Sequence, residues 1–288
     1  MTPTGVLAGL LGAVSFGAGD FTGAFAARRS SALIVVAGAH ATGLVALLAG
    51  LVILRPPLPP VDAVLFGMAA GVAGMVGLAT LYRGMAIGSM GLVTSLAGAG
   101  SLVLPLLAAA LAGASTSPVQ LIGVACAALA AAAAGGASRD EVGRTALALA
   151  GAAAIGFGAW YVLLDVAATR GDPLWALVFS RAVSAALAAV VVAVRGFDRS
   201  GVPVRLVVVA GLFDVGGNAL YVVAREGMHV GLAAALIGLY PIVTMLLARF
   251  VLNERLTRLG QVGIALALAG IVLISLGASE PATPVSGW

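Results

Sequence analysis

The stretch GLVTSLAGAGSLVLPLLAAALAG at residues 91–113 aligns with GLAAALIGLYPIVTMLLARFVLN at residues 231–253, at a constant offset of 140 residues. Extended to residue 130 of the first stretch, the alignment contains eleven identical positions out of 40. About four would be expected by chance in a chain so rich in Ala, Gly, Leu and Val. A hydrophobic chain made of two similar halves is typical of transporters built from structural repeats.

Composition indicates the solvent that surrounds this chain. Hydrophobic residues make up 61% of it, charged residues 9%, and the mean hydropathy is +1.15, whereas soluble domains average about 25% charged residues. Too few polar residues are present to coat a soluble globule, so we expect a polytopic protein in contact with the lipid bilayer. Its basic residues are scattered singly through short loops, which predicts no nucleic-acid partner. The single cysteine, Cys126, excludes an internal disulfide.

Ten apolar runs are long enough to cross about 30 Å of hydrocarbon. They lie at residues 4–26, 31–54, 62–82, 89–112, 117–137, 146–168, 173–195, 203–224, 230–252 and 258–278. Clusters of proline, glycine and charged residues separate them, as is typical of water-exposed turns. We therefore predict an all-α polytopic membrane protein with ten transmembrane helices.

The two halves divide the chain into a first repeat at 1–140 and a second at 141–279, followed by a tail at 280–288 that we expect to be disordered. Outside the main alignment, Phe-Gly-Ala at 16–18 recurs at 157–159. Each repeat contains five spans, and an odd number of spans inserts the second copy upside down relative to the first. The prediction is a pair of inverted five-helix repeats.

Three stretches point to a known family: Phe16–Phe21 in the first span, Leu239–Val243 in the ninth, and Leu252–Leu256 before the tenth, followed by Gln261, Gly263 and Gly270. With them, nearly the whole chain resembles the drug/metabolite transporter superfamily, in its EamA-like form with two five-helix repeats. The first repeat departs from this pattern. It has Ser101 where the second has Pro241, and Ala114 where the second has Glu254.

The resemblance implies a secondary transporter that exports or exchanges a small metabolite or drug across the cytoplasmic membrane of a bacterium. It also implies a cavity between the repeats and alternation between inward-open and outward-open states, and we expect the monomer to function without a cofactor. A channel, a non-transporting scaffold and an intramembrane enzyme are the alternatives. The sequence has no cluster with metal-ligand spacing, no Ser/His/Asp candidate in the loops and no phosphate-binding loop, which argues against an enzyme and a metal site.

Asp214 is the strongest candidate for a functional residue inside a span. A charge at mid-bilayer costs about 2.5–3.5 kcal/mol on insertion scales, so it needs a partner, water or a neutral form. Its helix face is small or polar throughout and also carries Asn218 and Tyr221. Such a face suits either a solute cavity or a close helix interface.

The other intramembrane candidates are Asp20, His40, Asp165, Arg181 and Tyr240. His40 and Arg181 occupy equivalent positions in the two halves, and the permanent charge of Arg181 could bind a carboxylate of the solute or of the protein. Asp165 is close enough to Arg170 for a local pair instead of a functional role. Tyr240 precedes a proline that loosens the backbone, which favours either a binding site or a plain kink.

Two transport mechanisms remain open at this point. In proton-coupled antiport, Asp20 or Asp214 alternates between protonated and ionised forms, because a desolvated carboxyl group favours the neutral form. In uncoupled facilitative exchange, the carboxylates stay paired with Arg181 and only solute crosses. Replacing Asp214 with asparagine separates the two mechanisms.

The orientation of the chain in the membrane is also open. Loops after odd-numbered spans carry ten arginines, whereas the opposite side carries three. The positive-inside rule then places both termini outside the cytoplasm. The family resemblance implies cytoplasmic termini, and accessibility of a C-terminal tag decides between the two.

Overall fold

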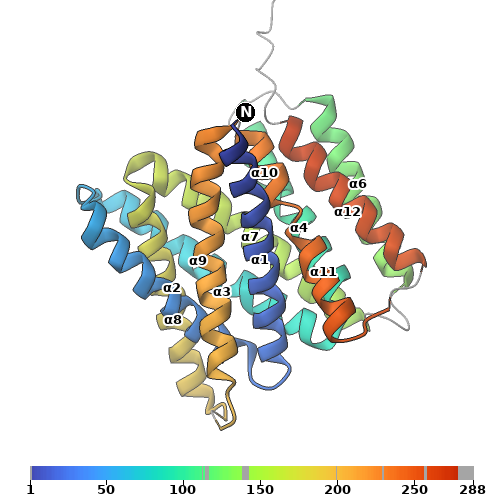
Figure 1. Ribbon diagram of the computed structural model, residues 1–288, viewed down its shortest axis with the longest axis horizontal. Helices are drawn as coiled ribbons and strands as arrows, with labels where there is room; N and C mark the ends of the chain where they lie inside the picture. Colours follow the sequence, from blue (N-terminus) through green and yellow to red (C-terminus); the bar gives the residue numbers. More distant parts are fainter. Residues whose placement is uncertain are drawn as a thin grey trace, which may run out of the picture.

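The computed structural model describes residues 2–111, 113, 117–137, 143–198, 200–228, 230–255 and 258–277, and arranges them as a bundle of α-helices (Figure 1). The helices are α1 Pro3–Ala27, α2 Ala32–Leu54, α3 Val61–Ile87, α4 Met90–Ser101, α5 Val103–Leu111, α6 Pro118–Ala137, α7 Gly143–Arg170, α8 Pro173–Arg195, α9 Val204–Gly227, α10 Val230–Ile237, α11 Tyr240–Val251 and α12 Arg258–Gly277. For this part of the chain the all-α prediction is confirmed.

The helices have the lengths and composition of membrane spans. Within the described ranges, nine helical segments are long and apolar enough to cross a bilayer, and α6 adds a shorter apolar stretch, Pro118–Ala130. Two of the nine are interrupted: Met90–Leu111 comprises α4 and α5, and Leu232–Val251 comprises most of α10 together with α11. The ten predicted spans therefore correspond to helices in order, and these apolar helices are compatible with a polytopic membrane protein.

The sequence fixes both ends of α8, the helix that carries Arg181. At its start, the carboxylate of Asp172 accepts a hydrogen bond from the backbone N–H of Leu174 at 2.8 Å. Pro173 takes the first helical position, where its missing N–H leaves no partner unsatisfied. At its end, Gly196 adopts the left-handed conformation, with φ of 63°. Arg181 is thereby held within the span, away from either end.

Helices of the first half pack against helices of the second half, and each such pair has an equivalent pair in which the halves are exchanged. α1 packs along α9 and α3 packs along α7, which are equivalent pairs when spans one to five correspond to spans six to ten. In the same way, α2 with α9 matches α8 with α3, and α1 with α10 and α11 matches α7 with α4 and α5. α2 pairs with its own counterpart α8 at one edge of the bundle, and α6 pairs with α12 at the opposite edge (Figure 1). The helix contacts are thus preserved when the halves are exchanged.

Close helix crossings at glycines show the same equivalence between the halves at individual residues. Gly71 of α3 lies against the carbonyl oxygen of Ser180 in α8, and Gly211 of α9 lies against the carbonyl oxygen of Ala39 in α2. Ala39 and Ser180 are equivalent in the sequence repeat, because each precedes one member of the His40–Arg181 pair. At both crossings a Cβ would collide with the backbone of the neighbouring helix, so only glycine permits the close approach.

The α6–α12 contact obeys the same relation. Gly123 of α6 packs on the backbone of Gly270 in α12, and Gly263 of α12 packs near the carbonyl oxygen of Ala130 in α6. The offset of 140 residues relates residue 123 to residue 263 and residue 130 to residue 270. The two glycine contacts of this crossing are therefore equivalent in the two repeats.

Replacing Gly211 with alanine is expected to destabilise the bundle by about 1–3 kcal/mol, the usual cost of overpacking a tight interface. The added Cβ would meet the carbonyl oxygen of Ala39, which cannot move without displacing α2. Gly151→Ala is the matched control, because nothing lies within 4 Å of a Cβ at that position of α7. Thermal unfolding of the purified variants measures the difference, and equal melting temperatures for the two variants would contradict the assigned crossing.

Some sequence-based expectations fall outside the described residues. The junction between the repeats lies partly in residues 138–142, and the tail at 280–288 lies within residues 278–288. Ala114, the first-repeat counterpart of Glu254, is outside them as well. These expectations remain predictions.

Candidate functional site

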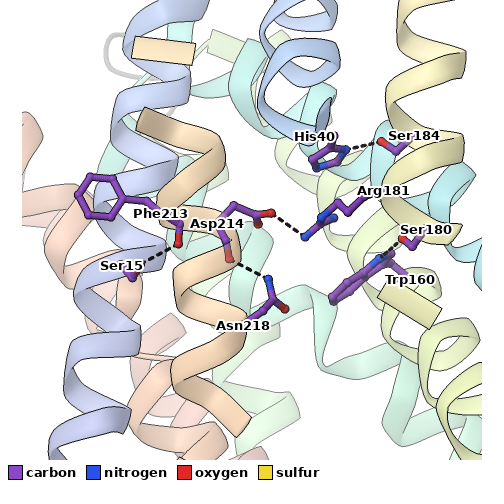
Figure 2. A network of polar contacts seen from close by, with 9 residues as sticks. All are labelled: Ser15, His40, Trp160, Ser180, Arg181, Ser184, Phe213, Asp214 and Asn218. Carbon is purple, nitrogen blue, oxygen red and sulfur yellow. Dashed lines mark hydrogen bonds and ion pairs between the residues drawn. The ribbon is translucent and has the colours of Figure 1, made fainter. Parts of the chain in front are cut away.

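An ion pair lies among the apolar helices. Arg181 extends from α8 toward Asp214 on α9, and its Nη2 atom is 2.8 Å from the Oδ2 atom of Asp214 (Figure 2). The exposed fraction of the side chain is 6% for Arg181 and 20% for Asp214. The structure therefore joins two of the predicted site residues, which lie on different helices, into one charge pair.

Trp160 of α7 covers one side of this ion pair. The Cζ atom of Arg181 is 5.6 Å from the centre of the Trp160 ring, a distance that permits a cation–π interaction. The indole N–H of Trp160 donates a hydrogen bond to the hydroxyl of Ser180 at 3.0 Å, which fixes the ring beside the guanidinium (Figure 2). Sequence analysis missed Trp160, because a tryptophan in a span is usually a packing residue.

His40 of α2 lies close to Arg181, its counterpart in the second half. Its ring is buried, and its Nδ1 atom is 2.5 Å from the hydroxyl oxygen of Ser184, one turn after Arg181 on α8 (Figure 2). The positive charge of Arg181 acts on the His40 ring. His40 therefore connects the first half of the chain to the charged helix of the second half.

Two hydrogen bonds involve the backbone of α9 at Asp214. The Asn218 side-chain amide donates to the carbonyl oxygen of Asp214 at 2.8 Å, and the Ser15 hydroxyl of α1 donates to the carbonyl oxygen of Phe213 at 2.7 Å (Figure 2). Asn218 thus makes a contact within its own helix, and Ser15 ties α1 to α9. Ser15 was not predicted, because an isolated serine in a span carries no distinctive sequence signal.

A second carboxylate, Asp20 of α1, faces the same region. Asp20 is partly buried, and the negative charges of Asp20 and Asp214 repel each other. Tyr82 of α3 is fully buried nearby and is subject to the charges of Asp20, Asp214 and Arg181. The Tyr82 ring lies against Gly23, where any side chain would occupy the space of the phenol. The first half therefore contributes Asp20, which the sequence predicted, and Tyr82, which sequence analysis did not single out.

Tyr240 lies at the break between α10 and α11. Its ring packs edge-on against Phe16 of α1, with ring centres 6.4 Å apart. One turn later, the hydroxyl of Thr244 donates to the carbonyl oxygen of Gly17 at 3.0 Å. Gly17 itself lies against the carbonyl oxygen of Tyr240. Tyr240 therefore lies where the ninth span is interrupted, and this interruption is packed against α1.

A matching break occurs between α4 and α5, at Leu102. Gly158 of α7 lies against the carbonyl oxygen of Ser101 there, and Gly158 is the counterpart of Gly17 in the Phe-Gly-Ala repeat. Pro105 lacks the N–H that would bond back to Ser101, so the helix is weakened at this point. Helix breaks in equivalent spans of two halves are typical of transporter binding sites.

Tyr161, Tyr221 and Asp165 extend the group of polar side chains. The charges of Asp20 and Asp214 act on the hydroxyl of Tyr161 of α7, which was not among the predicted site residues. Asp165 is exposed, and its charge acts on Tyr221 rather than entering the Arg181–Asp214 pair.

The alternative of a local pair between Asp165 and Arg170 is not what the structure shows. Arg170 instead pairs with Asp62 of α3 at 3.5 Å and lies over the Phe66 ring at 4.6 Å. This contact joins the two halves near the start of α3 and the end of α7, where both charged side chains are about half exposed.

Glu254 joins the halves at the other end of the bundle. Its carboxylate accepts hydrogen bonds from the Ser89 hydroxyl at 2.5 Å and from the Met90 backbone N–H at 3.1 Å. Asn253, with φ of 55°, turns the chain after α11 so that this carboxylate meets the N-terminus of α4. A negative charge is stabilised at a helix N-terminus. The family signature at Glu254 is therefore a contact between the two halves.

No group of three or more potential metal ligands occurs among the described side chains. The charged residues of the site are arginine and carboxylates that contact one another rather than converging on a point between them. The arginine can bind an anionic group, and a carboxylate can bind a cationic group or carry a proton.

Comparisons with known proteins agree with this architecture. Residues 144–276, in the second half of the chain, match the EamA-like transporter family, the family that the sequence resembles. None of the curated proteins matches the chain. A solved crystal structure, described only as that of a protein, is 20% identical to this chain. The alignment covers 96% of this chain and 98% of the other, with a TM-score of 0.58, so the two share a fold over nearly their whole length.

Proposed function

We propose a transport function on the premise that residues 144–276 belong to the EamA-like transporter family, within the drug/metabolite transporter superfamily. The family and the apolar helices together support a membrane transporter rather than an enzyme. On this basis the chain exports or exchanges a small metabolite or drug across the bacterial cytoplasmic membrane. A monomer suffices, because the charged group lies within a single chain.

The observation that carries this proposal is the Arg181–Asp214 ion pair inside the apolar bundle. Buried charges are costly in a membrane and mark solute or ion pathways more often than they stabilise a fold. Asp20 and His40 of the first half face this pair of the second half. The solute-binding cavity accordingly lies where the two halves meet, with Tyr161, Tyr221 and Tyr240 on its walls.

The arithmetic of charge in this group favours proton coupling. Arg181 provides one positive charge, whereas Asp20 and Asp214 provide two negative charges when both are ionised. One carboxylate therefore needs a proton or a cationic group of the solute whenever the site is closed to water. Proton antiport satisfies this requirement, since solute and proton take turns at the second carboxylate. Uncoupled exchange is the alternative, with a cationic solute taking that place.

Alternating access follows from treating the halves as inverted repeats. The exchange-symmetric helix pairs, the matched glycine crossings and the two interrupted spans all support this arrangement. Two conformations related by exchange of the halves would then open opposite ends of the bundle. The Glu254 contact with α4 is one that must break when its end opens.

Transport can be tested with the full-length protein in liposomes that enclose a pH-sensitive dye, to which fractions of a bacterial small-molecule extract are added. We expect at least one fraction to change the internal pH, with no change in protein-free liposomes. Exchange of a labelled solute without a pH change would favour the uncoupled alternative. The absence of both signals for every fraction would contradict the transport function.

A further inference from the structure

A hollow lies between α11 and α12, away from the charged group around Arg181 and Asp214. Its volume is about 620 Å³, and it is lined by Met245, Leu246, Arg249, Glu254, Arg255 and Gln261. It lies where α11 ends at Val251 and α12 begins at Arg258. This is the same end of the bundle as the turn between α1 and α2 (Figure 1). The hollow is therefore at the level of a membrane–water boundary.

The charge of the hollow is positive. Arg249 and Arg255 both border it and are exposed. The described part of the chain provides no carboxylate within 4 Å of either guanidinium. Glu254 does not neutralise them directly, because its carboxylate is directed to Ser89 and the N-terminus of α4. Two guanidinium groups are thus available to an anion at this point.

The same hollow has an apolar side. Met245 and Leu246 line it, one turn before Arg249 on α11, and Leu246 is 45% exposed. Leu246 therefore lies deeper in the span than the arginines, in the region of the acyl chains. The hollow presents apolar side chains toward the membrane interior and guanidinium groups toward its surface.

We propose that this hollow binds the headgroup of an anionic phospholipid. The phosphate would lie between Arg249 and Arg255, whose planar guanidinium groups match phosphate oxygens. The acyl chains would pack along Met245 and Leu246. Basic pockets between transmembrane helices are typical sites for anionic lipids. Arg28, Arg29, Arg195 and Arg205 also lie at this end of the bundle, which favours an anionic membrane surface here.

The position of this site couples it to the contact between the halves. Glu254 lines the hollow and also holds the N-terminus of α4. A lipid phosphate beside Glu254 would repel its carboxylate and compete with that contact. The bound lipid is therefore placed to weaken one of the contacts that hold this end of the bundle together.

The test is native mass spectrometry of the full-length protein titrated with phosphatidylglycerol or with phosphatidylcholine of the same acyl chains. We expect the protein to retain phosphatidylglycerol preferentially. Each arginine near a membrane surface contributes about fivefold to anionic-lipid affinity. Arg249→Gln/Arg255→Gln should therefore lower phosphatidylglycerol affinity about 25-fold if the two contributions add.

The matched control is Arg195→Gln/Arg205→Gln, which removes the same charge from exposed arginines at the same end that do not line the hollow. This control should retain the wild-type affinity. An equal loss in both double variants, or none in the first, would overturn the site. If the first double variant does not fold, the two single variants carry the test, and unchanged affinity in both has the same meaning.

The source of the phosphate is tested separately with soluble glycerol phosphate. Millimolar glycerol phosphate should not displace phosphatidylglycerol, because it lacks the acyl chains that pack on Leu246. Displacement would overturn the lipid assignment in favour of a site for free phosphate esters. These binding measurements require no transport activity, so they stand or fall independently of the proposed function.

Discussion

Replacing Arg181 with glutamine is expected to reduce transport at least about a hundredfold. Removing one partner of a buried ion pair costs about 3–5 kcal/mol, because the remaining charge is left without compensation. In this chain the remaining charge is Asp214, whose side chain is only 20% exposed. It would face Asp20, a second carboxylate that already repels it. Solute flux into liposomes and thermal unfolding of the same preparation measure the two consequences.

The double variant Arg181→Gln/Asp214→Asn distinguishes a fold defect from a transport defect. It removes both charges together, so neither is left uncompensated inside the bundle. We expect its melting temperature to recover toward that of the wild type, while transport stays at background. Wild-type transport by the double variant would show that the ion pair is structural and would remove the main support for the proposed site.

Asp214→Asn is expected to abolish proton-driven uptake while solute counterflow survives. Asparagine has the size of aspartate, but it cannot release or accept a proton. Counterflow needs only solute binding and the change of conformation, and the charge of Arg181 is still balanced by Asp20 after this substitution. Both fluxes are measured in the same liposomes, with and without an imposed pH gradient, and are normalised to the amount of folded protein.

Asp198→Asn is the matched control for that substitution. It makes the same chemical change at an exposed carboxylate in the turn after α8, which contacts Ser200 outside the charged group. Its proton-driven uptake should equal that of the wild type. If Asp214→Asn also retains both fluxes, Asp214 has a structural role, and the proton-coupling proposal passes to Asp20 alone.

The fold was predictable because its main determinant is local. Membrane spans require long apolar runs, and such runs are legible in the sequence without knowledge of their neighbours. The interruptions at Leu102 and before Tyr240 were harder to predict, since Pro241 marks one of them directly but the other depends on Pro105, one turn beyond the break. Even so, both lie in the equivalent span of the two halves, about one turn apart when the halves are aligned at the offset of 140 residues.

The candidate site was only partly predictable. Asp20, His40, Arg181 and Asp214 were identifiable one by one, because polar groups in apolar spans are expensive. The sequence did not predict that these four residues lie together. It also did not identify Trp160 and Tyr82, which resemble ordinary packing residues. Asn218 lies one turn after Asp214, and its amide bonds to the backbone of its own helix.

By itself, the sequence determined that the chain is a helical membrane protein with two similar halves, and it named the charged residues that need an explanation. Periodicity, length and composition suffice for this, since each is a property of one segment. Only the tertiary structure decided that Arg181 pairs with Asp214 rather than with Asp20, and that Glu254 caps α4 in the other half. Partner choice depends on how helices far apart in sequence cross, and those crossings are set by glycines such as Gly71 and Gly211 acting against neighbours that no local pattern reveals.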